Sequence, residues 1–276
     1  MTSRFSEALV YADRLHADQR RKGGGVPYIG HLLSVAGLVI EAGGGESESI
    51  AALLHDAAED HGGESRLAEI NELFGSEVAG IVRACSDSLE SPKPSWRVRK
   101  ERYVAGLQNV PDGAVLVSMA DKLDNSRAIL RDLNAVGEAV WDRFGVSEPK
   151  EHLWYFDSLL AVYRVRSNSW MVEALGDTIE AIRQAAEAQD ALSIGRLREV
   201  ERSLSAGRIW LQREEAQVAG ERMMLSPGDP GDDWDYENNA AMERLFARTR
   251  QTLETLEAER EINVDELVRM RRVRSR

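Results

Sequence analysis

The sequence predicts an all-α protein, a helical bundle followed by a helical C-terminal extension. Helical periodicity dominates from the start of the chain, where apolar residues recur every three or four positions. The apolar residues on one face of the opening segment are Phe5, Ala8, Leu9, Ala12 and Leu15. Glycines and prolines gather in short segments that separate the periodic ones. A strand is arguable only in residues 113–130, where β-branched residues cluster, but the apolar pattern continues past Asp121 as a buried helix requires.

Breaks in this periodicity divide the bundle into helices. Three glycines and a proline in RRKGGGVPYIG (20–30) cannot continue the first helix. A glycine triplet at 43–45 ends the second helix, and two prolines make SPKPS (91–95) a loop. The predicted helices cover residues 5–15, 31–42, 47–60, 67–75, 77–87, 95–107 and 113–130. Helices also fit the proline-free stretch from 150 to about 225.

The domain prediction is a folded domain over 1–185 and a charged helical extension over 186–276. Within the extension, SPGDPGDD (226–233) predicts an acidic linker between two helices. The apolar stripes of these helices are Leu197, Val200, Leu204, Leu211 and Val218 before the linker, and Met242, Leu245, Phe246, Thr249, Leu253 and Leu256 after it. We expect these helices to pack on the first domain, on another copy of the chain or on a protein partner. The closing RMRRVRSR is either a partner contact or a disordered tail.

Composition and charge narrow the functional classes. A formal net charge of −12 argues against non-specific binding to nucleic acid or to an anionic membrane. No apolar run is long enough to span a bilayer, and charged residues spread through the first segment argue against a signal peptide. Cys85 is the single cysteine, which excludes an internal disulfide, fits a reducing cytoplasm and suits a small core residue.

Two histidines and two carboxylates form a candidate metal-binding set: His31, His55, Asp56 and Asp121. Imidazole nitrogen and carboxylate oxygen suit a first-row divalent ion in a mixed site, and two carboxylates neutralise its charge. Adjacent residues of a helix diverge by about 100°, so His55 and Asp56 can share an ion only if it sits over the edge between them. The alternative is a helix end with solvated acids, which the crowding of like charges disfavours.

Glu59 and Asp60 are the candidate catalytic residues. Glu59 lies four residues after His55, and Asp60 lies four residues after Asp56. On one continuous helix both carboxylates would return to the face that the metal occupies. A carboxylate in that position can orient a water molecule, take its proton and pass the proton to a leaving group.

Three sequence blocks resemble the signature blocks of HD-domain hydrolases of the RelA/SpoT type. RKGGGVPYIGH (21–31), LLHDAAED (53–60) and ADKLDNSR (120–127) occur in the order and spacing of that family. The resemblance covers roughly residues 5–165 and is closest to the stand-alone small alarmone hydrolases. It implies an all-α HD domain that uses Mn²⁺ to remove the 3′-pyrophosphate from the guanine nucleotides ppGpp and pppGpp.

The resemblance also implies roles for residues at matching positions. It assigns the metal to His31, His55, Asp56 and Asp121, and the activation of water to Glu59 and Asp60. It assigns guanine and phosphate contacts to Arg21 and Lys22, and the plane of an arginine side chain is suited to stacking on a base. Tyr28 and Asn125 match positions that line the nucleoside pocket.

The distal phosphate of such a substrate needs further cations, because one metal ion cannot neutralise a pyrophosphate. The candidates are Lys22, Arg97 and Lys100. Arg97 and Lys100 lie three residues apart and are expected to share a helix face that Lys93 and Arg99 do not join. The alternative is that the aromatic residues of this helix pack in the core while its cations are solvated.

Three positions depart from the family pattern and leave other functions open. His61 replaces a small hydroxyl residue, Asp124 stands where a histidine or an aromatic residue is common, and Ala128 stands where longer enzymes often carry threonine. One alternative function is hydrolysis of another nucleotide such as NADPH. Another is an antitoxin-like partnership with an alarmone synthetase through the C-terminal extension. The complete metal set argues against a purely binding domain.

Overall fold

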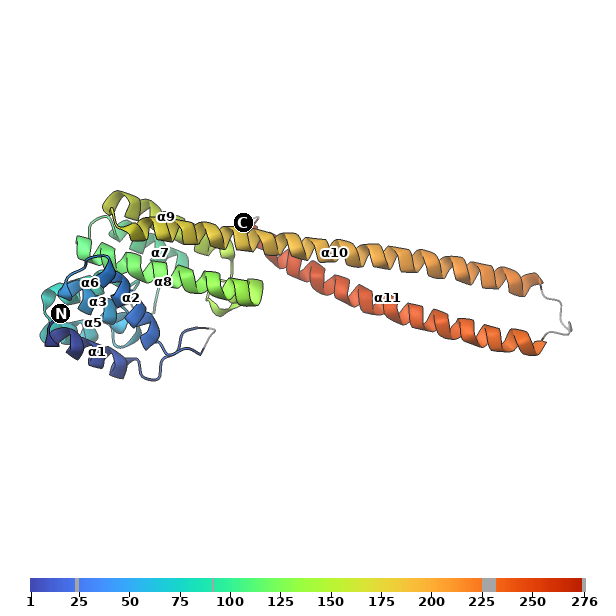
Figure 1. Ribbon diagram of the computed structural model, residues 1–276, viewed down its shortest axis with the longest axis horizontal. Helices are drawn as coiled ribbons and strands as arrows, with labels where there is room; N and C mark the ends of the chain where they lie inside the picture. The colour runs from blue at the N-terminus through green and yellow to red at the C-terminus, as the bar shows by residue number, and fades with distance from the viewer. Residues whose placement is uncertain (23–24, 91, 225–231, 275–276) are drawn as a thin grey trace. The chain divides into compact units, whose positions relative to one another are not determined.

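The computed structural model describes residues 1–22, 25–90, 92–224 and 232–274. These residues form helices, turns and loops with no strand among them, and an isolated antiparallel bridge pairs Arg20 with Pro27 (Figure 1). The all-α prediction is therefore confirmed. The segment 113–130, the one place where a strand was arguable, lies inside the helix Asp112–Val136.

The chain divides into two compact units, Met1–Glu187 and Ala188–Arg276. The helices of the first unit are α1 (Ser3–Leu15), α2 (Ile29–Glu41), α3 (Glu46–Leu54), α4 (Ala57–Asp60), α5 (Glu64–Phe74), α6 (Ser76–Cys85), α7 (Trp96–Gly106), α8 (Asp112–Val136), the 3₁₀ helix η1 (Gly137–Arg143), α9 (Pro149–Arg166) and the beginning of α10 (Trp170–Met224). The second unit contains the rest of α10 and α11 (Asp232–Arg274). Positions 226–231 of the predicted acidic linker and positions 275–276 of the basic tail lie outside the described residues. Among the described helices, none combines the length and the apolar character needed to cross a membrane.

The core of the first unit lies between α2, α3, α6 and α8, which pack against one another. Ile50, Leu53 and Leu54 of α3 are completely buried there, together with Leu32 of α2 and Leu123 of α8. Burying a leucine side chain stabilises a fold by about 1.5–3 kcal/mol relative to leaving it exposed. Because these helices share one core, polar residues on their inner edges are brought close to one another.

The end of α2 follows from the glycine triplet after it. Gly43 has a φ of +85°, a left-handed conformation that residues with a side chain rarely adopt. The backbone N–H of Gly43 donates to the carbonyl oxygen of Ile40 at 3.0 Å, which closes the last turn. The predicted end of this helix is confirmed.

The predicted helix over 47–60 is wrong in one respect, because it is interrupted at His55 and Asp56. Helix α3 ends at Leu54, and α4 begins at Ala57. Asp56 has φ −95° and ψ −6°, whereas a regular helix has a ψ of about −42°. The interruption allows two adjacent side chains to converge, which the angle of about 100° between neighbours on a continuous helix disfavours.

The single cysteine lies in the core of the first unit, as predicted. Cys85 is 7% exposed, and its Sγ lies 3.8 Å from the carbonyl oxygen of Ala114. Burial raises the pKa of the Cys85 thiol far above its ordinary value. The side chain therefore stays protonated and serves as a small apolar residue.

In the second unit, the remainder of α10 packs against α11. Val200 and Leu204 of α10 are buried with Leu253 of α11, and Leu211 and Leu256 pack beside them. All five residues belong to the two apolar stripes of the sequence. At these five positions the stripe of each helix is therefore covered by the other helix.

Candidate metal centre

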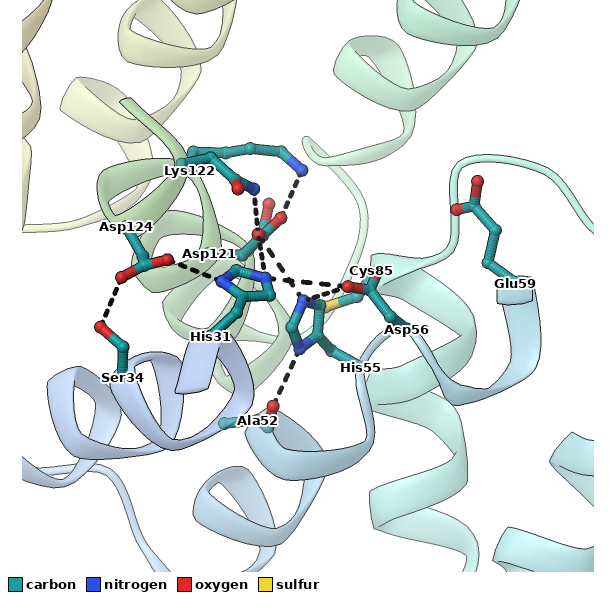
Figure 2. A network of polar contacts seen from close by, with 12 residues as sticks. His31, Ser34, Ala52, His55, Asp56, Glu59, Cys85, Asp121, Lys122 and Asp124 are labelled. Atoms are coloured by element: carbon teal, nitrogen blue, oxygen red, sulfur yellow. Dashed lines mark hydrogen bonds and ion pairs between the residues drawn. The ribbon is translucent and has the colours of Figure 1, made fainter. Parts of the chain in front are cut away.

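Three segments of the first unit bring four polar side chains together (Figure 2). His31 comes from the first turn of α2, His55 and Asp56 from the turn after α3, and Asp121 from α8. His55 Nε2 lies 3.0 Å from Asp56 Oδ2, and His31 Nε2 lies 3.7 Å from the same oxygen. Asp121 Oδ1 lies 3.3 Å from His31 Nε2 and 3.6 Å from His55 Nε2. The structure thus places all four residues of the proposed metal set in one cluster.

Both imidazole rings are held through Nδ1, so that Nε2 faces the cluster. His55 Nδ1 lies 2.8 Å from the carbonyl oxygen of Ala52, which can only accept, so Nδ1 carries the proton. His31 Nδ1 lies 2.7 Å from Asp124 Oδ2 and donates in the same way. In the neutral ring Nε2 is then the lone-pair nitrogen, which is the arrangement that metal-binding histidines use.

The donor atoms in the cluster fit a divalent metal ion. His31, His55 and Asp56 each offer one donor atom, and these three atoms lie within 4.8 Å of one another. His55 Nε2 is buried, and although carboxylate oxygens of Asp56 and Asp121 lie 3.0 and 3.6 Å away, no described residue is placed to make a well-directed hydrogen bond with it, as buried polar atoms usually do. Imidazole nitrogens with a carboxylate oxygen suit Mn²⁺, Fe²⁺, Co²⁺ or Zn²⁺. These three residues form a possible divalent-metal site, and Asp121 lies beside them.

The electrostatics of the cluster favour an added positive charge. Burial alone would lower the pKa of His55, but Asp56 and Asp121 raise it well above its ordinary value. Burial alone would raise the pKa of Asp56, but His55 holds it below its ordinary range. Burial alone would also raise the pKa of Asp121, but Lys122 and the two histidines hold it well below its ordinary value. The carboxylates therefore stay ionised and draw protons onto the imidazoles, and a divalent cation would supply the same positive charge.

Neighbouring side chains fix both carboxylates. The Tyr28 hydroxyl donates to Asp56 Oδ2 at 2.5 Å. Lys122 Nζ lies 2.5 Å from Asp121 Oδ2, and Asn125 Nδ2 donates to Asp121 Oδ1 at 2.5 Å. Tyr28 and Asn125, the two residues expected to line a nucleoside pocket, thus contact the two carboxylates of the cluster directly.

Glu59 and Asp60 lie on α4, next to the cluster but engaged elsewhere. Glu59 Oε2 accepts a hydrogen bond from the backbone N–H of Asp87 at 2.8 Å, and Oε1 lies 2.9 Å from Lys93 Nζ. Asp60 Oδ2 accepts from Gln19 Nε2 at 2.7 Å. Figure 2 shows Glu59 apart from the cluster, and within the described part of the chain no hydrogen bond or ion pair joins either carboxylate to it. The expected shared helix face does not exist, because the helix is interrupted between α3 and α4.

His61 takes part in holding Asp60. His61 Nε2 lies 2.9 Å from Gln19 Oε1, and His16 Nδ1 lies 2.6 Å from the same oxygen. An amide oxygen only accepts, so both ring nitrogens carry protons. The amide nitrogen of Gln19 is thereby directed at Asp60. His61 is a contact of the glutamine that orients a candidate catalytic carboxylate.

Arg21 reaches from the loop before α2 to α8. Its Nη1 donates to Asp124 Oδ2 and its Nη2 donates to Asn125 Oδ1, both at 2.7 Å. The plane of the guanidinium group is therefore fixed by two adjacent side chains. Lys22, the next residue, is exposed on the loop. Arg21 is thus placed beside the metal cluster.

The cations of α7 do not follow the expected pattern. Lys100 Nζ lies 3.0 Å from Asp87 Oδ2, and Arg99 forms an ion pair with the same oxygen. Arg97 Nη1 instead lies 2.7 Å from Glu151 Oε2. The expectation that Arg99 stands apart from Lys100 is wrong, because Asp87 attracts both side chains.

The contacts made by two aspartates, Asp124 and Asp87, were not predicted from the sequence. Burial alone would raise the pKa of Asp124, but hydrogen bonds from His31 and Ser34 lower it to about 2. The available signal was its position three residues after Asp121, which places both on one face of a helix. Asp87, which binds two cations, was predicted as the last residue of the helix over 77–87, but α6 ends at Cys85 and Asp87 lies in the segment after it.

Comparisons with known proteins agree with this arrangement. A protein-family profile described as HD domain matches residues 8–145, a span that contains all four residues of the cluster. The guanosine-3′,5′-bis(diphosphate) 3′-pyrophosphohydrolase MESH1 of Homo sapiens is 37% identical over 145 residues, which cover 51% of this chain and 76% of that protein. The Drosophila melanogaster protein of the same name is 34% identical over 143 residues, which cover 51% of this chain and 75% of that protein.

A bacterial relative and a solved structure are also similar. The guanosine-3′,5′-bis(diphosphate) 3′-pyrophosphohydrolase of Aquifex aeolicus is 33% identical over 125 residues, which cover 45% of this chain and 18% of that protein. The structure of a metazoan ortholog of SpoT, described as hydrolysing ppGpp and playing a role in starvation responses, superposes with a TM-score of 0.54. It is 27% identical in sequence, and the match covers 65% of this chain and 96% of that one.

Proposed function

This chain belongs to the HD-domain family, and on that premise we propose that it is a metal-dependent 3′-pyrophosphohydrolase of guanosine tetraphosphate and pentaphosphate. In this reaction the bond between the ribose 3′ oxygen and phosphorus breaks. The oxygen of water joins the departing pyrophosphate, a proton goes to the ribose oxygen, and GDP or GTP remains. The observation that carries the proposal is the cluster of His31, His55, Asp56 and Asp121, with all but Asp56 buried, in a chain whose relatives are named for this activity.

The proposal assigns the metal to the four clustered residues, with Mn²⁺ as the native ion. Mixed nitrogen and oxygen ligands accept several first-row ions, and the choice of Mn²⁺ rests on the family resemblance. When bound, such an ion supplies Lewis-acid polarisation of a phosphoryl oxygen and acidifies a nearby water. The side chains of His31 and His55 are prepared for this role, because each Nδ1 is already engaged and each Nε2 faces inward.

Glu59 and Asp60 are proposed to orient the attacking water and to take its proton. Each carboxylate is anchored from outside the cluster, Glu59 by Lys93 and the backbone of Asp87, and Asp60 by Gln19. These anchors hold both groups at the end of α4, within a few residues of the metal ligands. Catalytic hydrogen bonds are often long or misaligned before substrate binds, so the present contacts are compatible with this role.

Positive charge near the cluster suits a nucleotide with several phosphates. The whole chain carries a formal charge of −12, so an anionic substrate requires a local concentration of cations. The fixed guanidinium plane of Arg21 is proposed to stack on a guanine base. Asn125 contacts Arg21 directly, and Tyr28 and Asn125 donate to the carboxylates assigned to the metal. Lys22, Arg97 and Lys100 are the proposed contacts of the phosphates.

A substrate panel on metal-stripped protein tests the proposal. The panel contains ppGpp, pppGpp, NADPH and the nucleoside triphosphates, each assayed without metal and after addition of Mn²⁺, Fe²⁺, Co²⁺ or Zn²⁺. We expect hydrolysis of ppGpp and pppGpp that requires an added ion and is fastest with Mn²⁺. Preferential release of phosphate from NADPH would assign the site to another nucleotide, and activity that persists without any ion would remove the metal from the mechanism.

A further inference from the structure

Asp124 collects hydrogen bonds from three segments of the first unit. Its Oδ2 accepts from Arg21 Nη1 and from His31 Nδ1, both at 2.7 Å. Its Oδ1 accepts from Ser34 Oγ at 2.5 Å. The side chain of Asp124 is 14% exposed, so these are partly desolvated, charge-assisted contacts. Figure 2 shows the carboxylate between Ser34 and His31, on the side of His31 opposite the metal cluster.

Arg21 and Asp124 belong to a closed circuit of polar contacts. Arg21 Nη2 donates to Asn125 Oδ1 at 2.7 Å, and Asn125 Nδ2 donates to Asp121 Oδ1 at 2.5 Å. That oxygen lies 3.3 Å from His31 Nε2, and His31 Nδ1 returns to Asp124. The loop that carries Arg21 is thus joined to two residues of the metal cluster, once through Asp124 and once through Asn125.

We propose that Asp124 is a positioning residue that couples nucleotide binding at Arg21 to metal binding at His31. This inference rests on the proposed function, because it takes His31 as a metal ligand and Arg21 as a nucleotide contact. The carboxylate fixes the tautomer and the direction of the His31 ring, which raises the basicity of Nε2. The same oxygen fixes the plane of the Arg21 guanidinium group, which determines the face that a base can stack on.

Two consequences follow from the shared oxygen. Loss of the carboxylate affects metal affinity and nucleotide affinity together, although Asp124 contacts neither ligand in the proposal. The dependence is reciprocal. A nucleotide that orders Arg21 also stabilises the orientation of Asp124 that holds His31, and a metal bound at His31 stabilises the orientation of Asp124 that holds Arg21.

The Asp124→Asn variant keeps the size of the side chain but replaces one acceptor oxygen with a donor N–H₂ group. Through its single oxygen an amide can still accept from Arg21 and His31, with its N–H₂ group turned to the Ser34 hydroxyl, but it carries no negative charge, so the charge-assisted strength of both hydrogen bonds is lost. Asp132→Asn is the matched control, since Asp132 lies on the same helix and pairs with Arg131 and Arg143 outside the cluster.

The first arm of the test measures the dissociation constant of Mn²⁺ for metal-stripped protein, from the electron paramagnetic resonance signal of free Mn²⁺. We expect Asp124→Asn to weaken the affinity by about 10–100-fold, and Asp132→Asn to leave it unchanged. Equal affinities for the unaltered protein and Asp124→Asn would overturn the inference. This arm needs no turnover, so it remains decisive even if the protein proves inactive on ppGpp.

The second arm measures ppGpp binding to metal-stripped protein for Arg21→Ala, Asp124→Asn and the double variant. If Asp124 acts on the nucleotide through Arg21, the double variant binds no more weakly than Arg21→Ala alone. Strictly additive losses would show that Asp124 acts on the nucleotide independently of Arg21 and would overturn the coupling. A far-ultraviolet circular dichroism spectrum of each variant checks that the fold is retained.

Discussion

The Tyr28 hydroxyl donates a hydrogen bond of 2.5 Å to Asp56 Oδ2 and so joins the loop after the glycine segment to the metal cluster. Burial and the charge of Asp56 raise the pKa of Tyr28 far above its ordinary value, so the phenol remains protonated and donates at any physiological pH. The ring of Tyr28 stacks on His16 with centroids 5.3 Å apart, which fixes its direction. Tyr28 therefore orients a carboxylate that is proposed to bind the metal, at the edge of the proposed nucleoside pocket.

Replacing Tyr28 with phenylalanine removes only this hydrogen bond. A lost contact to a metal-binding carboxylate costs about 10–100-fold in metal affinity or activity, so we expect Tyr28→Phe to lower kcat/KM and Mn²⁺ affinity within this range. Tyr11→Phe is the control, because the Tyr11 hydroxyl accepts from Arg66 away from the cluster. Equal kinetics and Mn²⁺ affinity for Tyr28→Phe and the unaltered protein would contradict the assignment.

Lys100 is a stronger candidate than Arg97 for the distal phosphates. Burial, and then the nearby Lys122, lower the pKa of Lys100 even though Asp87 lies 3.0 Å away and shares its charge with Arg99, so an added anion would stabilise the lysine cation. Arg97 already pairs with Glu101 and Glu151. We expect Lys100→Met to raise the KM for ppGpp by about 10–100-fold, the equivalent of one charged hydrogen bond, and Arg97→Met to have a smaller effect. The reverse order in steady-state kinetics would place the phosphates at Arg97.

Stability at mildly acidic pH is expected to depend on His152. Its ring is stacked on Trp141 with centroids 5.3 Å apart, and its Nε2 donates to the carbonyl oxygen of Val146 at 2.7 Å. Burial lowers the pKa of His152 below its ordinary value of about 6.5. As pH falls below that value the unfolded chain takes up the proton first, so stability is complete above about 6.5 and declines below it.

Urea unfolding between about pH 7 and pH 5, the range in which histidine titrates, measures this decline. One such histidine contributes at most about 1.4 kcal/mol per pH unit to the slope. His152→Gln keeps a donor for Val146 but does not titrate, so we expect a shallower slope than in the unaltered protein. His16, whose pKa is also lowered by burial, retains part of the effect. Identical slopes for the two proteins would show that His152 does not titrate in this way.

Disruption of the helical pair of the second unit is expected to leave hydrolysis intact. Leu204 is 4% exposed between α10 and α11, and placing a carboxylate there by Leu204→Glu costs several kcal/mol because the charge has no partner. Leu192→Glu is the control, since Leu192 is 63% exposed on the same helix. We expect circular dichroism to show loss of helix for Leu204→Glu alone. Activity on ppGpp is expected to persist, because every proposed site residue lies within Met1–Glu187, and its loss would show that catalysis needs the second unit.

The helical elements were predictable because they depend on local periodicity and on glycine and proline. The end of α2 at Gly43 and the buried helix through 113–130 are examples. The interruption at His55 and Asp56 was not predictable, since both residues have ordinary helical neighbours and the turn depends on packing between α3, α6 and α8. A period of 3.6 residues predicts faces only as long as the helix is continuous.

The candidate metal-binding residues could be identified from residue type and order, whereas the side chains that orient them could not. Histidine and aspartate in known blocks indicate ligands, but a partner such as Asp124 is defined by the distance between α2 and α8. Spacing also misplaced Arg99, because Asp87, which was predicted to end a helix, lies in the segment after α6, where its carboxylate attracts both Arg99 and Lys100. Local sequence thus indicated the candidate ligands, and only the fold showed which side chains orient them.

Product analysis for ppGpp with the Mn²⁺-loaded protein, compared with Asp56→Ala, tests the central claim most directly. Asp56 contributes a carboxylate to the cluster and lies outside both flanking helices, so its loss removes a ligand with little effect on the core. We predict that the unaltered protein releases GDP and inorganic pyrophosphate in equal amounts, and that Asp56→Ala, with an unchanged circular dichroism spectrum, releases neither. Release of orthophosphate in place of pyrophosphate, or undiminished turnover by Asp56→Ala, would contradict the account.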